Sequence, residues 1–203
     1  LRLVSIPTVL SVDAFVTPGA GVRRNHEVHY LGETSPDPLV IDYDLVRTAP
    51  PELNIAGVGD LLSIHTGTFD WCLAQAADKS EYPFSQPDVD KARYILNHVM
   101  ELAVEIRQCT DEGLQAIVDG YMQVNTICIP AGHYRVEDGS EHYVFYELEE
   151  RLKRPFVHGN IVALGIYLMS RLQENRAEQV TAFMDEVGLN YHPAAMNISR
   201  EDL

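Results

Sequence analysis

The chain has 203 residues, of which 46% are hydrophobic and 22% are charged, and its formal net charge is -15 at pH 7. A chain of this length and composition buries a core as one large domain or two small ones, so extensive disorder is not expected. The negative charge leaves nothing to neutralise a phosphate backbone, which excludes nucleic acid as a partner.

Two further features bear on the cellular location. The longest apolar run, at residues 161–169, is far shorter than the ~20 residues of a membrane span, so we expect no membrane partner. The three cysteines, Cys72, Cys109 and Cys128, have no CxxC spacing, and no basic-then-apolar leader opens the sequence. Both observations favour the reducing cytoplasm.

Short extended runs occupy the first part of the chain, at residues 1–6, 27–31 and 39–41, and turn residues separate them. Runs of this kind are typical of strands. They are too few to form a stable sheet without partners. We therefore predict that residues 1–55 are the last strands of a larger α/β domain, the first half of which lies outside this chain.

After Pro50 and Pro51 the pattern becomes helical, because apolar residues recur at a spacing of three to four. We predict helices over residues 60–79, 88–108, 110–128, 140–152, 158–172 and 174–187. A loop is predicted at 130–138, and Gly188 is the expected C-cap of the last helix. The predicted fold class is therefore mainly α, with a multi-helical C-terminal domain over residues 56–203.

Asp60, His142 and His158 stand in the short signatures GVGDLLS, GSEH and FVHG. Taken singly, Asp60 has an ordinary interpretation as a helix N-cap, and each histidine as a hydrogen-bonded structural group. All three are predicted at or near helix starts, where side chains from separate helices can converge. One carboxylate and two imidazoles suit zinc, iron or nickel, and three protein ligands leave the open positions of a catalytic metal. Such an ion would polarise an alcohol oxygen and prepare its carbon for hydride loss.

The same signatures carry a family resemblance. The GVGDLLS stretch at 57–63 followed by FDW at 69–71, the GSEH run at 139–142 and the HG pair at 158–159 resemble three metal motifs. They are similar to those of the iron-containing alcohol dehydrogenase superfamily, in the branch of glycerol dehydrogenase and glycerol-1-phosphate dehydrogenase. Residues 6–14, IPTVLSVDA, resemble the segment that runs past the nicotinamide in that branch. The motifs follow the family order along nearly the whole chain and imply a dehydroquinate synthase-like fold. In that fold, residues 1–55 would be the C-terminal strands of a Rossmann-like α/β domain that binds the dinucleotide.

The resemblance implies further roles. Asp13 matches the family position beside substrate and nicotinamide, and Thr8 and Thr17 match positions that contact the dinucleotide. Tyr146 stands where many relatives carry a second histidine, so it is a catalytic candidate that can donate a hydrogen bond but is a poor proton shuttle near neutral pH. Asn160 replaces the acid or glutamine of many relatives, and the sequence contains no glycine-rich phosphate loop.

The hypothesis that follows from the resemblance is an NAD- or NADP-linked oxidoreductase. It would act on the CH–OH group of a glycerol-like polyol or polyol phosphate, with hydride transfer from a metal-bound alcohol to the nicotinamide. We expect a homo-oligomer, and we expect these residues alone to be inactive, because half of the cofactor site would lie outside them.

Two alternatives stay open. One is a sugar-phosphate cyclase of the dehydroquinate synthase type, for which Arg151, Lys153 and Arg154 would be phosphate-binding candidates. Such cyclases generally present Glu at the first ligand position, so Asp60 favours the dehydrogenase. The other is a non-catalytic remnant that keeps the fold and acts as a binding or assembly module.

Overall fold

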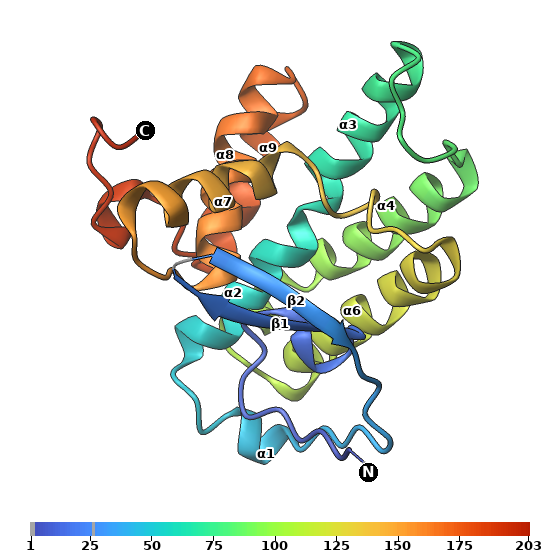
Figure 1. Ribbon diagram of the computed structural model, residues 1–203. Helices are drawn as coiled ribbons and strands as arrows, with labels where there is room; N and C mark the ends of the chain where they lie inside the picture. The colour runs from blue at the N-terminus through green and yellow to red at the C-terminus, as the bar shows by residue number, and fades with distance from the viewer. Residues whose placement is uncertain (1–2, 26) are drawn as a thin grey trace.

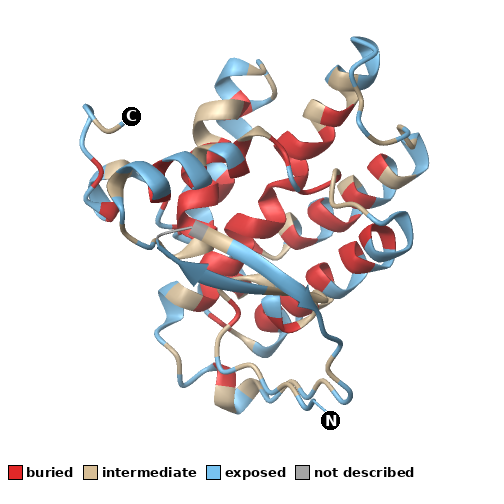
Figure 2. Cartoon of the chain, in the orientation of Figure 1, coloured by how far each residue is buried: buried red, intermediate tan, exposed pale blue. Residues whose placement is uncertain are grey.

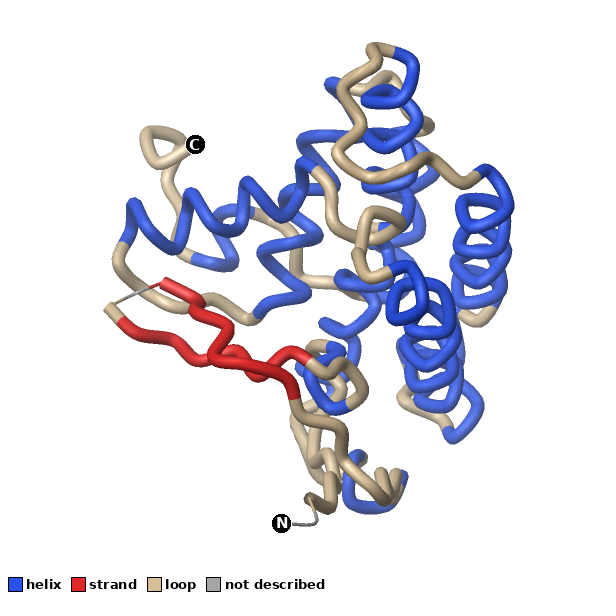
Figure 3. The backbone as a smooth tube through the Cα atoms, turned by 45° about the vertical axis from the view of Figure 1, so that its right-hand side comes forward, coloured by secondary structure: helices blue, strands red, loops and turns tan. Residues whose placement is uncertain are grey.

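The computed structural model describes residues 3–25 and 27–203. A β-hairpin and the extended N-terminal segments lie on one side of a larger helical assembly (Figures 1 and 3). The helices make up most of the described chain, so the predicted mainly-α class is confirmed. None of the described helices is both long enough and apolar enough to cross a bilayer.

The N-terminal part contains one hairpin and two short helical turns. Strands β1 (Gly19–Arg24) and β2 (Glu27–Glu33) pair antiparallel, a 3-10 turn precedes them at Asp13–Phe15, and helix α1 (Tyr43–Val46) follows. The predicted extended run at 27–31 is therefore confirmed. Of the runs at 1–6 and 39–41, the described residues form only an isolated parallel bridge between Ser5 and Leu39, and residues 1–2 lie outside the description.

Strand β1 was not predicted, since its sequence GAGVRR lacks the alternation that signals a strand. Its glycines lie under the ring of Tyr30 from β2, which comes 3.2 Å from an ideal Cβ built on Gly19. The cross-strand aromatic ring replaces the side-chain packing that the glycines cannot provide.

The helical part follows from Pro51 onward. Its elements are α2 (Pro51–Leu62), α3 (Ile64–Ala76), α4 (Gln86–Glu101), α5 (Ala103–Arg107), α6 (Asp111–Ala131), α7 (Ser140–Leu152), α8 (His158–Leu172), α9 (Ala177–Val187) and a 3-10 turn at Pro193–Met196. Local chemistry sets several ends: the Thr110 hydroxyl accepts from the N–H of Gly113 to cap α6, and Gly188 takes the left-handed conformation, φ 76°, after α9.

Three predicted boundaries are wrong. The helix predicted at 60–79 is two helices, because Pro51 at the first helical position starts α2 and the chain bends at Ser63. Asp60 therefore lies in the last turn of α2, and its interpretation as an N-cap is wrong. The helix predicted at 88–108 breaks at Leu102, and α6 continues through Pro130 into the predicted loop.

Helices α2 and α8 pack against each other and are buried along most of their length (Figure 2). The surrounding core contains fully buried Trp71, Tyr121 and Ile117. The segment before Asp13 is fixed to this core by Asn54, whose Oδ1 accepts from the N–H of Leu10 at 3.1 Å and whose Nδ2 donates to the carbonyl of Val46 at 3.0 Å. The N-terminal segment is thus held beside α2.

Candidate metal centre

Two glycines bring α2 and α8 into backbone contact. An ideal Cβ on Gly59 would lie 2.0 Å from the carbonyl oxygen of Gly159, and one on Gly159 would lie 1.6 Å from that of Ala56. No side chain larger than hydrogen fits at either position. The contact places Asp60, in the last turn of α2, against His158, the first residue of α8, and Asp60 Oδ1 lies 3.0 Å from His158 Nε2.

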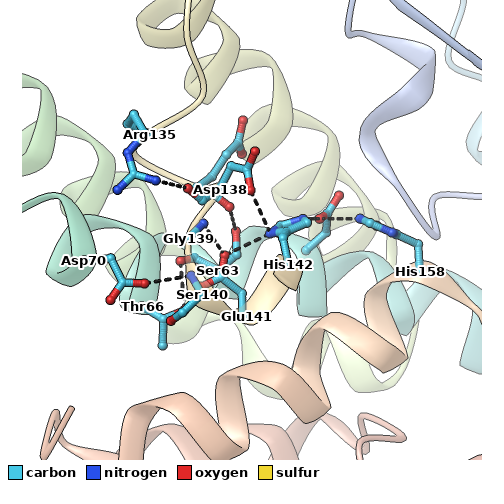
Figure 4. Close-up of polar contacts among 12 residues, drawn as sticks. Ser63, Thr66, Asp70, Arg135, Asp138, Gly139, Ser140, Glu141, His142 and His158 are labelled. Carbon is cyan, nitrogen blue, oxygen red and sulfur yellow. Dashed lines mark hydrogen bonds and ion pairs between the residues drawn. The ribbon is translucent and has the colours of Figure 1, made fainter. Parts of the chain in front are cut away.

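Helix α7 supplies the third side chain. His142 lies in its first turn, with Nε2 3.5 Å from Asp60 Oδ1, and the two imidazole rings point toward one another with their centroids 5.4 Å apart (Figure 4). One donor atom from each of Asp60, His142 and His158 lies within 4.8 Å of the others. Helix α2 and the two later, consecutive helices α7 and α8 therefore meet at one point.

This donor set fits a divalent transition metal. A carboxylate oxygen and two imidazole nitrogens are ligands that zinc, iron and nickel accept, and such a triad leaves positions open for a substrate. Asp60 and His142 are each only 8% exposed, so water does not compete freely for them. A divalent ion would also balance the negative charge that several buried acids concentrate here.

The electrostatic interactions of Asp60 and His142 agree with a role as metal ligands. Burial by itself would raise the pKa of the Asp60 carboxyl, but His158 and His142 outweigh burial and hold that pKa below its ordinary range. Burial would likewise lower the pKa of His142, yet its hydrogen bonds to Asp60 and Glu141 hold it well above the ordinary value. Asp60 is therefore an ionised carboxylate paired with His158 and His142.

More titratable groups surround the set. Burial, followed by the charge of Asp60, raises the pKa of the half-buried Asp13 to about 8. Burial and the charge of Asp13 raise the pKa of Glu137 well above its ordinary value, and Glu137 Oε1 accepts from the Cys128 thiol at 3.6 Å. The hydroxyl of buried Tyr121 donates to the Gly57 carbonyl at 2.7 Å and lies 3.5 Å from Asp60 Oδ2.

Comparison with known proteins adds a second line of observation. No family model matches the chain. It is 27% identical over 200 residues to a glycerol-1-phosphate dehydrogenase [NAD(P)+] of Aeropyrum pernix, a match that covers 98% of this chain and 56% of that protein. The match to the enzyme of the same name from Pyrococcus horikoshii is 30% identical over 172 residues and covers 85% of this chain and 49% of that protein.

The chain is a homologue of the glycerol-1-phosphate dehydrogenases. It spans about half the length of the curated relatives it matches. Its fold is that of the iron-containing alcohol dehydrogenases. The structure of a probable glycerol dehydrogenase from Sinorhizobium meliloti superposes with a TM-score of 0.73 at 23% identity, covering 98% of this chain and 59% of that one. An iron-containing alcohol dehydrogenase from Corynebacterium glutamicum gives a TM-score of 0.64 at 14% identity, with 98% and 57% coverage.

The structure places the remaining predicted site residues of the chain at different distances from the three candidate ligands. Asp13 lies close enough to Asp60 for their charges to interact. Thr17 is half-buried and donates to the Asp13 carbonyl through its N–H at 3.2 Å, and Thr8 is exposed on the segment before Leu10. Tyr146 lies one turn after His142 on α7 and is 39% exposed.

Tyr146 has a partner that sequence reasoning missed. Burial, together with the charge of Tyr30 and a hydrogen bond to its hydroxyl, raises the pKa of Tyr146. The ring of Tyr30 packs over Gly19 and Gly21 of the neighbouring strand. Arg23 of β1 also binds Glu149 of α7, at 2.8 Å from Nη2 to Oε1, so the hairpin is held on that helix.

Three further residues near the centre were missed: Glu137, Glu141 and Tyr121. Glu141 lies inside the GSEH motif and could have been noticed there, whereas nothing in the pattern around Glu137 or Tyr121 distinguishes them from other loop and core residues. Two of the three phosphate candidates of the cyclase hypothesis, Arg151 and Arg154, have structural contacts instead. Arg151 donates to the Glu201 carbonyl at 3.2 Å, and Arg154 donates to that of Asn197 at 2.9 Å, which ties the end of α7 to the C-terminal tail.

Proposed function

We propose that this chain supplies the metal- and substrate-holding part of an NAD(P)-linked dehydrogenase that oxidises a glycerol-like polyol or polyol phosphate. The observation that carries the proposal is the convergence of Asp60, His142 and His158 from three helices. The names of the homologues support a dehydrogenase in preference to a cyclase. Zinc, iron and nickel all suit the donors.

The proposed roles follow from the geometry. Asp60 Oδ1 and the Nε2 atoms of His142 and His158 would hold the ion. When bound, the ion would polarise a substrate oxygen and lower the pKa of the hydroxyl. Asp13 would orient the substrate by accepting a hydrogen bond from a second hydroxyl group, since its carboxyl lies beside Asp60 and is accessible from the half-buried turn at Asp13–Phe15.

Residues of the hairpin and of α7 would complete the site. Tyr146 and its partner Tyr30 would present hydroxyl groups to the substrate and limit the access of water from the side of the hairpin. Their raised pKa values keep both phenols protonated at neutral pH, so they act as hydrogen-bond donors. Thr8 and Thr17 remain predicted contacts of the dinucleotide. Cytoplasmic location and assembly as a homo-oligomer also remain predictions.

The first test is the metal content of the purified chain. We expect near-stoichiometric zinc, iron or nickel in the wild type and its loss in the double variant Asp60→Ala/His142→Ala, because two of three ligands are removed. The matched control is Asp90→Ala/His98→Ala, which removes the same residue types from the exposed face of α4 and should leave metal content unchanged. Absence of metal from the wild type after loading with each ion would refute the proposal and favour the binding or assembly module.

A further inference from the structure

Glu141 is a fully buried carboxylate, with 0% of its surface exposed. A buried carboxylate is strongly unfavourable unless hydrogen-bond donors surround it. Glu141 lies in the first turn of α7, directly before His142, and none of the roles described above uses it.

Three donors converge on this carboxylate (Figure 4). Oε2 accepts from the Thr66 hydroxyl at 2.6 Å, and Oε1 accepts from the Gly139 N–H at 2.7 Å. Oε1 also lies 2.9 Å from Nδ1 of His142. Because a carboxylate only accepts hydrogen bonds, Nδ1 must carry the proton of this pair. In the neutral ring, the lone pair is then on Nε2, the atom that faces Asp60.

Contacts with α3 and α8 hold the start of α7, and with it Glu141, in place. Asp70 of α3 accepts from the N–H of Ser140 at 2.7 Å and from Nε2 of Gln173 at 2.8 Å, which fixes the start of α7 against α3 and α8. On the other side, Gly165 of α8 approaches so closely that an ideal Cβ there would lie 2.4 Å from the Glu141 carbonyl oxygen. The carboxylate therefore has little freedom to turn away from His142.

Two other arrangements of these groups are less favourable. Asp138 Oδ1 also faces His142 Nδ1, but at 3.7 Å and with half of its side chain exposed, so Glu141 is the stronger acceptor. Asp138, Glu141 and His142 are close enough to form a second metal set. However, both oxygens of Glu141 already accept hydrogen bonds from Thr66 and Gly139, which leaves it poorly suited to be a ligand.

We propose that Glu141 is a positioning residue for the metal centre, which accepts the Nδ1 proton of His142 and aims Nε2 of that ring at the ion. This inference rests on the proposed metal site. A carboxylate bonded to the far nitrogen of a ligating histidine fixes its tautomer and orientation and makes the ring a better donor. Removing such a partner weakens metal affinity by about 10- to 100-fold.

The test compares two identical substitutions on one helix. Glu141→Gln keeps the shape of the side chain but removes its charge, and we expect its affinity for Zn²⁺, measured by competition with a chromogenic chelator, to fall about 10- to 100-fold. Glu149→Gln is the matched control, since Glu149 is also buried on α7 but pairs with Arg23 and not with a histidine. We expect its Zn²⁺ affinity to equal that of the wild type within about threefold.

A milder variant keeps the test decisive if Glu141→Gln does not fold. Thr66→Val retains Glu141 and His142 but removes the donor that holds Oε2, and it should lower Zn²⁺ affinity in the same direction by a smaller factor. NMR of the metal-free, ¹⁵N-histidine-labelled chain supplies a second readout. The Nδ1 proton of His142 should be observed in the wild type and in Glu149→Gln, and should shift in Glu141→Gln.

The outcomes separate this inference from the proposed function. A wild-type chain that binds none of Zn²⁺, Fe²⁺ and Ni²⁺ would overturn the metal centre and the role of Glu141 together. Wild-type affinity in Glu141→Gln, or an equal loss in Glu149→Gln, would overturn only the positioning role. Loss of affinity confined to Glu141→Gln and Thr66→Val, with the shifted Nδ1 proton, would establish it.

Discussion

Asp60 occupies a position that its own helix does not favour. The last turn of a helix carries a partial negative charge, so a carboxylate there is destabilised by the helix dipole. His158 and His142, which come from other helices, provide the compensating interactions. A side chain that is unfavourable locally and stabilised only by distant partners is typical of a functional site.

His65 provides a prediction about pH at the residue scale. Burial lowers the pKa of this imidazole from 6.5, and its Nε2 donates to the Asn175 carbonyl at 2.7 Å. Because the unfolded chain binds this proton more readily than the folded chain does, the stabilisation is present above pH 6.5 and is lost as the pH falls below that value. We expect His65→Gln to reduce the loss of stability between pH 7.5 and 5.5.

Urea unfolding of both proteins at the two pH values would measure this difference. The matched control is His98→Gln, which makes the same substitution at an exposed position of α4. Identical pH dependence of the wild type and His65→Gln would contradict the assignment.

At the scale of elements, the two glycines of the GVG run have separate tasks. Gly59 lets α8 approach, whereas an ideal Cβ on Gly57 would lie 2.0 Å from the carbonyl oxygen of Leu10, so Gly57 lets the segment that leads to Asp13 approach α2. The motif around Asp60 therefore specifies packing on both sides of α2 as well as a ligand.

Gly159→Ala tests this contact. The added methyl would meet the Ala56 carbonyl, and α2 and α8 must separate to admit it. We expect a loss of about 1–3 kcal/mol in the free energy of unfolding, typical of overpacking, with weaker Zn²⁺ binding because His158 moves from Asp60. Gly21→Ala on β1 is the control, since its Cβ would make only ordinary contact with Tyr30. Equal stability of the two variants by urea unfolding would refute the expected clash.

At the scale of the whole molecule, the proposed ion would connect α2 to α7 and α8, which follow it only after a long segment of the chain. Helices α2, α7 and α8 each contribute one ligand, and α7 also carries the hairpin through Arg23 and Glu149. Binding that requires the folded arrangement stabilises the folded state in proportion to the logarithm of ligand concentration.

Zn²⁺ at a hundred times its Kd should therefore stabilise the chain by ~2.7 kcal/mol. For a chain of this size, that corresponds to a rise in Tm of roughly 5–10 °C. Differential scanning calorimetry with and without a chelator would measure it. Asp60→Asn should lose the shift, and a rise of equal size in that variant would show that Zn²⁺ acts elsewhere.

The sequence by itself determined the mainly-α class, most helix positions from 110 onward and the three candidate ligands. Helix periodicity, the Thr110 cap and Gly188 are local signals, and the ligands lie in short motifs that can be recognised without coordinates. The first helix was predicted to begin at residue 60 instead of Pro51, because the glycines of α2 interrupt the apolar pattern. Strand β1 was not predicted, because it is supported by the ring of Tyr30 on β2 and not by an alternation in its own sequence.

The tertiary structure alone determines which side chains from different elements come together, because no local sequence pattern contains that information. The convergence of the ligands depends on the backbone contact between Gly59 and Gly159, and the proposed roles of Glu141 and Tyr30 depend on partners from other elements. Burial and the charges of neighbouring groups, which set the protonation of these side chains, exist only after the helices have packed.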